Sequence, residues 1–371
     1  MNTSAASAAV VDLDDADGLL AADRLGLLRA ASMAGAQVRA VAAALQEGEL
    51  DALRSDAPPR TVVWVAGRGP AANAGAMLAA ALGGTVGTPI VVASEAPPWI
   101  GALDVLIVAG DDAGDPLLAS AAAMGVRRGS RVVVVAPYEG PLRDATAGRS
   151  VALPPRMPVP DDFTLVRYLA AGLAVMQVIG AGNPVGLEAL ADELDAEAFR
   201  NSAGHEVFTN PAKGLAERMA GREVVFAGDT VPFLALARHA CTVMLRVAHR
   251  AVSAVGLADV LVAIGSGWGR DGEPDGRSIF HDEEIDGPLP QPTRTIVLTT
   301  DAERPAVTAR LMGFDDVHVV NSNDVPDTPE GAVTGEETRG LVPGIGRPEQ
   351  QLALLAVRIE MAAVYQRLVR G

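Results

Sequence analysis

A turn at residues 109–116 carries the residue types with the clearest binding chemistry in this sequence. It follows an apolar run at residues 105–108 that predicts a buried strand, and it contains Gly110, Asp111, Asp112, Gly114 and Asp115. In an open α/β sheet such a turn leads into a helix whose unpaired N–H groups bind phosphates and sugars. Three carboxylates in that place oppose a phosphate dianion, by roughly 1 kcal/mol for each nearby charge in a partly exposed site.

A second turn of this type follows the apolar run at residues 62–66 and contains Gly67, Arg68 and Gly69. Glycines here either let the backbone approach a bound ligand or serve only the turn of an ordinary α/β unit. Together with the glycines and the first two aspartates of the turn at 109–116, these three residues form the candidate ligand-binding set.

Two further groups of charged residues have alternative interpretations. Arg238, Arg246 and Arg250 recur at i, i+8 and i+12 of a helical tract, which forms either a basic stripe toward a cleft or a solvated face. We add Arg238 to the ligand-binding candidates. The run at residues 280–287, FHDEEIDG, is either a metal site or a solvated acidic patch, and the sequence predicts neither a metal nor a cofactor.

The elements around these residues alternate between strands and helices. Short apolar runs bounded by Gly or Pro predict strands at residues 62–66, 90–93, 105–108 and 132–135, with helices at 71–82 and 116–124 between them. Such alternation implies parallel pairing and a doubly wound sheet. A helical tract at 17–45 precedes this half, and another at 163–178 follows the proline-rich connection at 154–161.

The second half repeats the pattern, which predicts two Rossmann-like α/β domains at residues 1–182 and 183–371. Strands are expected at 223–227, 294–300 and 317–320, with a further strand at 260–264. Helices are expected at 231–255 and, at the end of the chain, at 350–368. Residues 265–278 and 321–348 are rich in Gly, Pro and acidic residues, so we expect long loops there.

Composition excludes several function classes. The 371 residues carry a net charge of −16, which argues against a nucleic-acid partner because phosphate backbones bind clustered Lys and Arg. No apolar stretch approaches the roughly 18 residues of a membrane span, and the N-terminus has no secretory pattern. One cysteine, Cys241, excludes an internal disulfide and a cysteine-based zinc site. We therefore expect a cytoplasmic protein.

Four segments resemble the double-SIS phosphosugar isomerases, and specifically the bifunctional phosphoglucose/phosphomannose isomerases. VVWVAGRGPAANAG at 62–75 is similar to their glycine loop, and NPAKGLAERMAGREVVFAG at 210–228 to the start of their second domain. FHDEEIDG at 280–287 resembles their NHNEIVG segment, and YQRLVRG at 365–371 their closing helix. The chain resembles still more closely the TobH-type proteins of actinobacteria. The resemblance implies two SIS domains with flanking N- and C-terminal helices, and a homodimer.

The resemblance also shows which chemical residues have changed. Isomerases of this kind move a proton between neighbouring carbons with a carboxylate, assisted by a histidine. The histidine is matched by His281, followed by Glu284, and these two are the catalytic candidates. No carboxylate occurs at residues 231–256, where Leu245 aligns with the base. The hydroxyls that hold phosphate in the family are replaced by the acidic turn at 109–116.

Two functions follow from this comparison. The first is a carbohydrate-derivative binding protein, a degenerate relative of the isomerases with a ligand-sensing or partner-regulating role. The alternative is an active aldose–ketose isomerase that interconverts glucose 6-phosphate or mannose 6-phosphate with fructose 6-phosphate. In both, the partner is a sugar phosphate or a related small molecule.

Overall fold

The chain forms two compact α/β units. The computed structural model describes residues 11–182, 186–268, 291–314, 316–323 and 347–370. The first unit consists of Arg29–Phe199 with Gly346–Val357, and the second of Met1–Leu28, Arg200–Ile345 and Arg358–Gly371. Each contains one parallel sheet, which confirms the predicted fold class. The boundary predicted at 182/183 falls at residues 183–185, outside the described residues, and stays a prediction.

The first unit is built on a five-stranded parallel sheet in the order β2-β1-β3-β4-β5. The strands are β1 Thr61–Ala66, β2 Ile90–Ala93, β3 Asp104–Ala109, β4 Arg131–Val135 and β5 Val151–Ala152. Every residue of the central strand β3 is buried. Parallel strands covered on both faces are rich in Val, Ile and Leu, which is why the apolar runs located them in the sequence.

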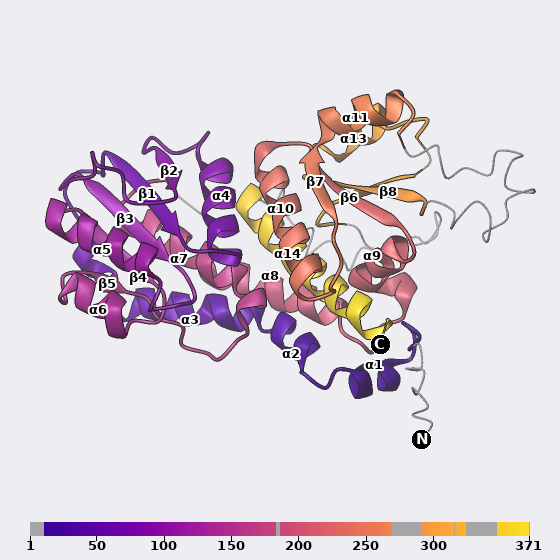
Figure 1. Ribbon diagram of the computed structural model, residues 1–371, viewed down its shortest axis with the longest axis horizontal. Coiled ribbons are helices and arrows are strands. Elements are labelled where there is room, and N and C mark those ends of the chain that lie inside the picture. The colour runs from indigo at the N-terminus through magenta and orange to yellow at the C-terminus, as the bar shows by residue number, and fades with distance from the viewer. Residues whose placement is uncertain (1–10, 183–185, 269–290, 315, 324–346, 371) are drawn as a thin grey trace, which may run out of the picture. The chain divides into compact units, whose positions relative to one another are not determined.

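Helices cover both faces of this sheet (Figure 1). On one face, α5 Pro116–Arg128 and α6 Gly140–Thr146 pack on Val63, Leu106 and Val132. On the other, α4 Pro70–Leu82 and α7 Leu165–Val178 pack around Trp64, with α3 Ala34–Gln46 against α7. The residue range of α8 is Leu187–Arg200, and short 3-10 turns lie at Asp51–Leu53 and Asp161–Phe163.

Trp64 requires two glycines on the helices that cover it. Its indole is fully buried, and its Nε1–H donates to the carbonyl of Ala71 at 3.0 Å. A Cβ on Gly75 would stand 2.3 Å from the indole, and one on Gly172 would stand 3.2 Å from it. The missing side chains therefore allow α4 and α7 to approach the sheet closely.

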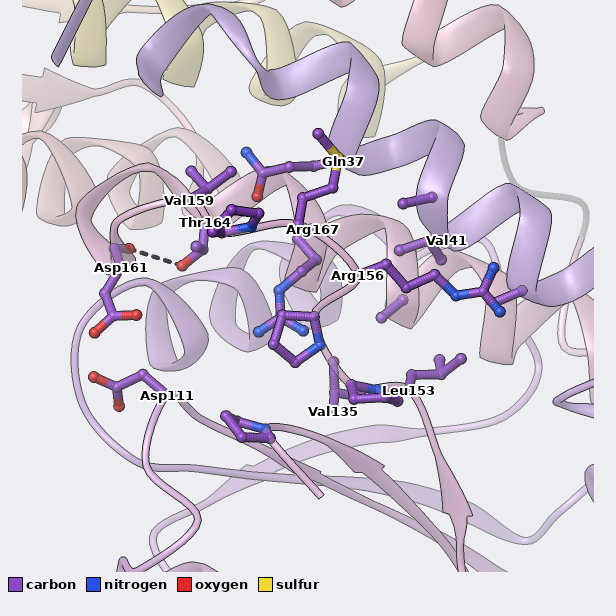
Figure 2. Close-up of a pocket in the computed structure, with 18 of the residues that line it drawn as sticks. Gln37, Val41, Asp111, Val135, Leu153, Arg156, Val159, Asp161, Thr164 and Arg167 are labelled. Carbon is purple, nitrogen blue, oxygen red and sulfur yellow. Dashed lines mark hydrogen bonds between the residues drawn. The ribbon is translucent and has the colours of Figure 1, made fainter. Parts of the chain in front are cut away.

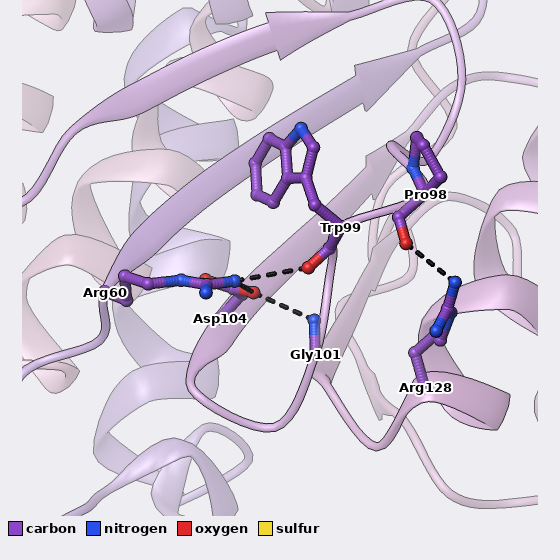
Figure 3. Close-up of polar contacts among 6 residues, drawn as sticks. All are labelled: Arg60, Pro98, Trp99, Gly101, Asp104 and Arg128. Carbon is purple, nitrogen blue, oxygen red and sulfur yellow. Dashed lines mark hydrogen bonds and ion pairs between the residues drawn. The ribbon is translucent and has the colours of Figure 1, made fainter.

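An ion pair to a buried carboxylate fixes the amino end of β3 (Figure 3). Asp104 is fully buried and accepts from Arg60 at 2.5 and 3.0 Å and from the Gly101 N–H at 2.8 Å. Arg60 also lies over the ring of Trp99, 5.8 Å from its centre. Because these contacts hold β3 at one end, the turn that follows its other end starts from a fixed position.

The second unit is built on a four-stranded parallel sheet in the order β7-β6-β8-β9. Its strands are β6 Glu223–Gly228, β7 Ser253–Gly256, β8 Thr293–Leu298 and β9 Val317–Val320. The helix bounds are α1 Ala16–Ala22, α9 Pro211–Met219, α10 Val231–Arg246, α11 Leu257–Gly265 and α13 Arg304–Arg310. Helix α2 is Leu27–Ser32, and α14 is Pro348–Leu368.

Three predicted elements were wrong in detail. Residues 260–264, expected as a strand, lie in α11, because a short apolar run does not distinguish a strand from one buried side of a helix. The helix expected at 231–255 ends at Arg246, before His249 with its positive φ of 53°, and residues 253–256 form β7. The tract at 17–45 is divided into three helices, with Gly26 at φ 65° in the first break.

The described parts of the chain contain no transmembrane span, because their helices are too short or too polar for one. The long loops expected at 265–278 and 321–348 lie mostly outside the described residues, so their conformation stays a prediction.

Lys213, the only lysine of the sequence, holds a loop of the second unit. Its side chain is fully buried, and its Nζ donates to the carbonyls of Ala203 at 2.8 Å and His205 at 2.7 Å. Burial lowers the pKa of this ammonium group. The ring of Tyr365 lies 5.6 Å from the same nitrogen.

We expect Lys213→Met to lower the free energy of unfolding by about 3 kcal/mol, because it leaves the buried carbonyl of Ala203 and the part-buried carbonyl of His205 without a donor. Urea denaturation of the full chain measures the change. Arg218→Met, on the exposed side of the same helix, is the control and should change stability by about 0.5 kcal/mol or less. Equal effects of the two substitutions would contradict a structural role for Lys213.

Candidate functional site

A cavity of about 180 Å³ lies at the carboxyl edge of the first sheet (Figure 2). Its walls come from the turns after β3 and β4, the connection at 153–161, and helices α3 and α7. A water molecule needs roughly 10–15 Å³ of such space, so the cavity has room for about a dozen waters. That is enough for a molecule of the size of a sugar. The polar side chains that line it include Gln37, Asp111, Arg156, Asp161, Thr164 and Arg167.

Arg167 is a buried cation without a counter-charge. It lies in α7, is 8% exposed, and its Nε has no hydrogen-bond partner. Its guanidinium carbon stands 4.3 Å from the centre of the Tyr168 ring, and no ion pair to it occurs in the described part of the chain. A buried charge is costly unless it is paired, so this arginine is a candidate for binding an anionic group.

Arg156 also lines the cavity, but it is already paired. Its Nη2 lies 2.5 Å from Glu47 and 2.6 Å from Glu49. Hydrogen bonds to these two carboxylates raise the pKa of Arg156 above its ordinary value. Arg167 is therefore the better anion-binding group.

Gln37 presents an acceptor to the same cavity. Its side chain is 3% exposed, and its Nε2 donates to the carbonyl of Phe163 at 2.9 Å. A carbonyl only accepts, so this bond fixes the orientation of the amide. Its Oε1 is left buried without a partner among the described residues.

Asp111 and Asp161 point toward each other at one side of the cavity (Figure 2). Burial raises the pKa of Asp111, but the hydrogen bond with Asp161, a backbone N–H and nearby Arg68 outweigh it, so the pKa lies below its ordinary value. Arg68 is exposed, and its Nη2 is 3.4 Å from Asp111. A hydrogen bond between two carboxyl groups requires a proton on one of them.

The other two aspartates of the turn bind the backbone of the turn itself. Asp112 accepts from the N–H of Gly114 at 2.7 Å, and Asp115 caps α5 by accepting from the N–H of Leu117 at 2.8 Å. A Cβ on Gly67 would stand 3.2 Å from the Asp115 carboxylate, so this carboxylate fills the space beside the glycine turn. The chain thus supplies its own anion where a phosphate would bind.

The predicted ligand-binding residues of the first unit meet at this edge of the sheet, but most of them do not line the cavity. The N–H groups of Gly67 and Gly110 donate to Ala109 and Val135, at 3.0 and 3.2 Å. Gly69, at φ 62°, is the N-cap residue of α4. Of the described members of the candidate set, Asp111 lines the cavity.

The remaining candidates lie elsewhere. Arg238 is an exposed residue of α10, in the second unit. His281 and Glu284, the catalytic candidates, fall outside the described residues, as does the acidic run that contains them. Within the described residues, no group of His, Cys, Asp and Glu side chains is arranged to hold a metal ion.

Several solved structures with the same fold match nearly the whole length of this chain. A protein of Clostridium difficile 630 named as a candidate phosphosugar isomerase has a TM-score of 0.60 at 12% identity, over 93% of each chain. Tagatose-6-phosphate ketose/aldose isomerase from Escherichia coli has a TM-score of 0.55 at 14% identity, over 97% of this chain and 96% of that chain. The C-terminal domain of glucosamine-fructose-6-phosphate aminotransferase from Francisella tularensis has a TM-score of 0.56 at 10% identity, over 94% and 95%. The chain has the phosphosugar isomerase fold.

This assignment rests on structure alone. The sequence matches no family model and no curated protein. The finer resemblances, to the bifunctional isomerases and to TobH-type proteins, stay predictions.

Sequence reasoning missed most of the polar residues that line the cavity, among them Gln37, Asp161 and Arg167. Arg167 did leave a signal, because it is the one charged residue of the apolar helix at 165–178. Gln37 left none, since a glutamine in an amphipathic helix is ordinary. Asp161 was assigned to a connection, and its role depends on where that connection runs.

Arg167 and Arg250 form a matched pair for a stability experiment. Both are buried, at 8% and 9% exposure, but Arg250 donates to the carbonyls of Met219 and Arg222 and to Gln366. We expect Arg250→Met to lower the free energy of unfolding by roughly 3 kcal/mol, because three acceptors lose their donor. Arg167→Met should lower it by about 1 kcal/mol or less, since the main interaction lost is with the Tyr168 ring. Urea denaturation of both variants measures the difference, and a larger loss for Arg167→Met would show that this arginine is structural.

Proposed function

We propose that this protein binds a sugar derivative with an anionic group in the cavity of the first unit, and that it is a degenerate isomerase relative that senses a ligand or regulates a partner. The observation that carries the proposal is Arg167, a buried guanidinium without a counter-charge that lines a cavity of suitable size. An anion bound there would supply the missing charge. A tagatose-6-phosphate isomerase shares the fold, which supports a phosphorylated sugar as the ligand class.

Loss of isomerase activity follows from two independent changes. The helix α10 contains no carboxylate, and Leu245, which aligns with the base of the family, is 59% exposed on that helix. General base catalysis contributes about 10²–10⁴-fold to rate. The turn before α5 holds Asp112 and Asp115 on its own N–H groups, so a phosphate anchored there would lose its positioning contacts.

One observation favours the alternative of an active isomerase. Asp111 and Asp161 place two carboxyl groups in the cavity, and either group is of the type that moves protons between neighbouring carbons. In that case Asp111 would act as the base, with His281 and Glu284 as further candidates.

Ligand binding is tested with a panel of hexose phosphates in a thermal-shift assay at physiological salt. A ligand at a hundredfold excess over its Kd stabilises the protein by about 2.7 kcal/mol. We expect Arg167→Met to abolish this shift and Arg149→Met, an exposed arginine of the first unit away from the cavity, to leave it unchanged. A panel without any binder, or a shift that survives Arg167→Met, would contradict the proposal.

Activity is tested in a coupled assay for conversion of glucose 6-phosphate or mannose 6-phosphate to fructose 6-phosphate. We expect turnover far below the ~10 s⁻¹ of an ordinary enzyme. Turnover near that rate, abolished by Asp111→Asn or by His281→Ala, would establish the active isomerase instead.

We also propose a cytoplasmic homodimer, by resemblance to the double-SIS proteins. Residues 244–255 are a candidate contact surface, because their sequence is rich in apolar residues. Met244, Val247 and Ala248 are, however, buried within the chain, and Leu245 is the exposed apolar residue among them. If the dimer forms, its contact surface lies mainly elsewhere.

A further inference from the structure

The polar side chains of the cavity offer more hydrogen-bond acceptors than donors. A ligand that complements them must therefore carry donors. Gln37 Oε1 is a buried acceptor without a partner, and Asp111 and Asp161 add carboxyl oxygens. Among the described residues that line the cavity, Arg167 has a buried donor, Nε, without a hydrogen-bond partner. A sugar phosphate that carries only hydroxyl groups could place its phosphate on Arg167. Its other oxygens would then lie beside the carboxyl groups of Asp111 and Asp161.

The wall of the cavity adds to the imbalance. Four prolines line it, Pro137, Pro154, Pro155 and Pro158. Proline has no backbone N–H, so these positions offer no backbone donor to a ligand. An anion at this wall would therefore find few hydrogen bonds.

The carboxyl pair is also a better place for a cation than for a hydroxyl. Asp111 and Asp161 share a hydrogen bond that needs a proton on one of them. A compact ammonium group between them can take the place of that proton and donate to both. Arg68 lies 3.4 Å from Asp111, but its side chain is 77% exposed, so its repulsion of an ammonium group is largely screened by solvent.

We infer that the ligand is a sugar derivative that carries both a protonated amine and an anionic group, with the amine between Asp111 and Asp161 and the anion on Arg167. This inference rests on the proposed function. It adds an amine to the proposed ligand. The carboxyl groups at the acidic turn suit such a cation, whereas a phosphate-binding turn has no such groups.

Glucosamine 6-phosphate and glucose 6-phosphate are the probes, because they differ only in an amine or a hydroxyl at one carbon. Titration calorimetry of the full chain should give at least tenfold tighter binding of glucosamine 6-phosphate. Asp161→Asn and Asp111→Asn should each remove this preference, while Arg167→Met should weaken both probes alike. Asp112→Asn, in the same turn but outside the cavity, should keep the preference.

The outcomes separate the two proposals. Equal binding of the probes to the unaltered protein, or a preference that survives both Asp161→Asn and Asp111→Asn, overturns the amine and leaves the proposed function standing. Failure of both probes to bind overturns the inference and counts against the proposed function as well. Unfolding midpoints of the variants check that each one folds.

Discussion

Parallel pairing of the strands is the constraint on which the rest of the first unit depends. Because β1, β3 and β4 run in the same direction, the turns that follow them all lie at one edge of the sheet. Residues as distant in sequence as Arg68, Asp111 and Pro137 therefore meet there. The ion pair between Arg60 and the buried Asp104 at the other end of β3 keeps this strand, and hence the acidic turn, in register.

The acidic turn is a helix start in which carboxylates of the turn itself accept from its N–H groups. In phosphate-binding turns, the N–H groups at a helix start have no partner in the protein and bind an anion. Here Asp115 caps α5 and Asp112 binds Gly114, so these donors are satisfied when the site is empty. An N-cap of this kind stabilises a helix by about 1 kcal/mol. The hydrogen bonds that stabilise the turn also occupy N–H groups that would otherwise be free to bind a phosphate.

The buried polar groups of the protein divide into satisfied and unsatisfied ones. Lys213 and Arg250 have full sets of carbonyl or amide acceptors and hold loops and helices together. Arg167 Nε and Gln37 Oε1 lack partners and line the same cavity. Unsatisfied buried groups are expensive, and the ligand that we propose for this cavity would supply partners for both of these.

The sequence by itself determined the α/β class, the parallel strands at 62–66, 105–108 and 132–135, and the acidic turn, because these depend on local periodicity and turn chemistry. It misassigned 260–264, since a short apolar run fits a strand or a helix equally well. Only the tertiary structure decided the cavity. Gln37 and Phe163 are 126 residues apart, and Asp111 meets Asp161 only because α7 and the connection before it pack over the carboxyl edge of the sheet. The role of a lone arginine in an apolar helix can be inferred only when its neighbours in space are known. Helix packing determines those neighbours, and no local sequence pattern encodes it.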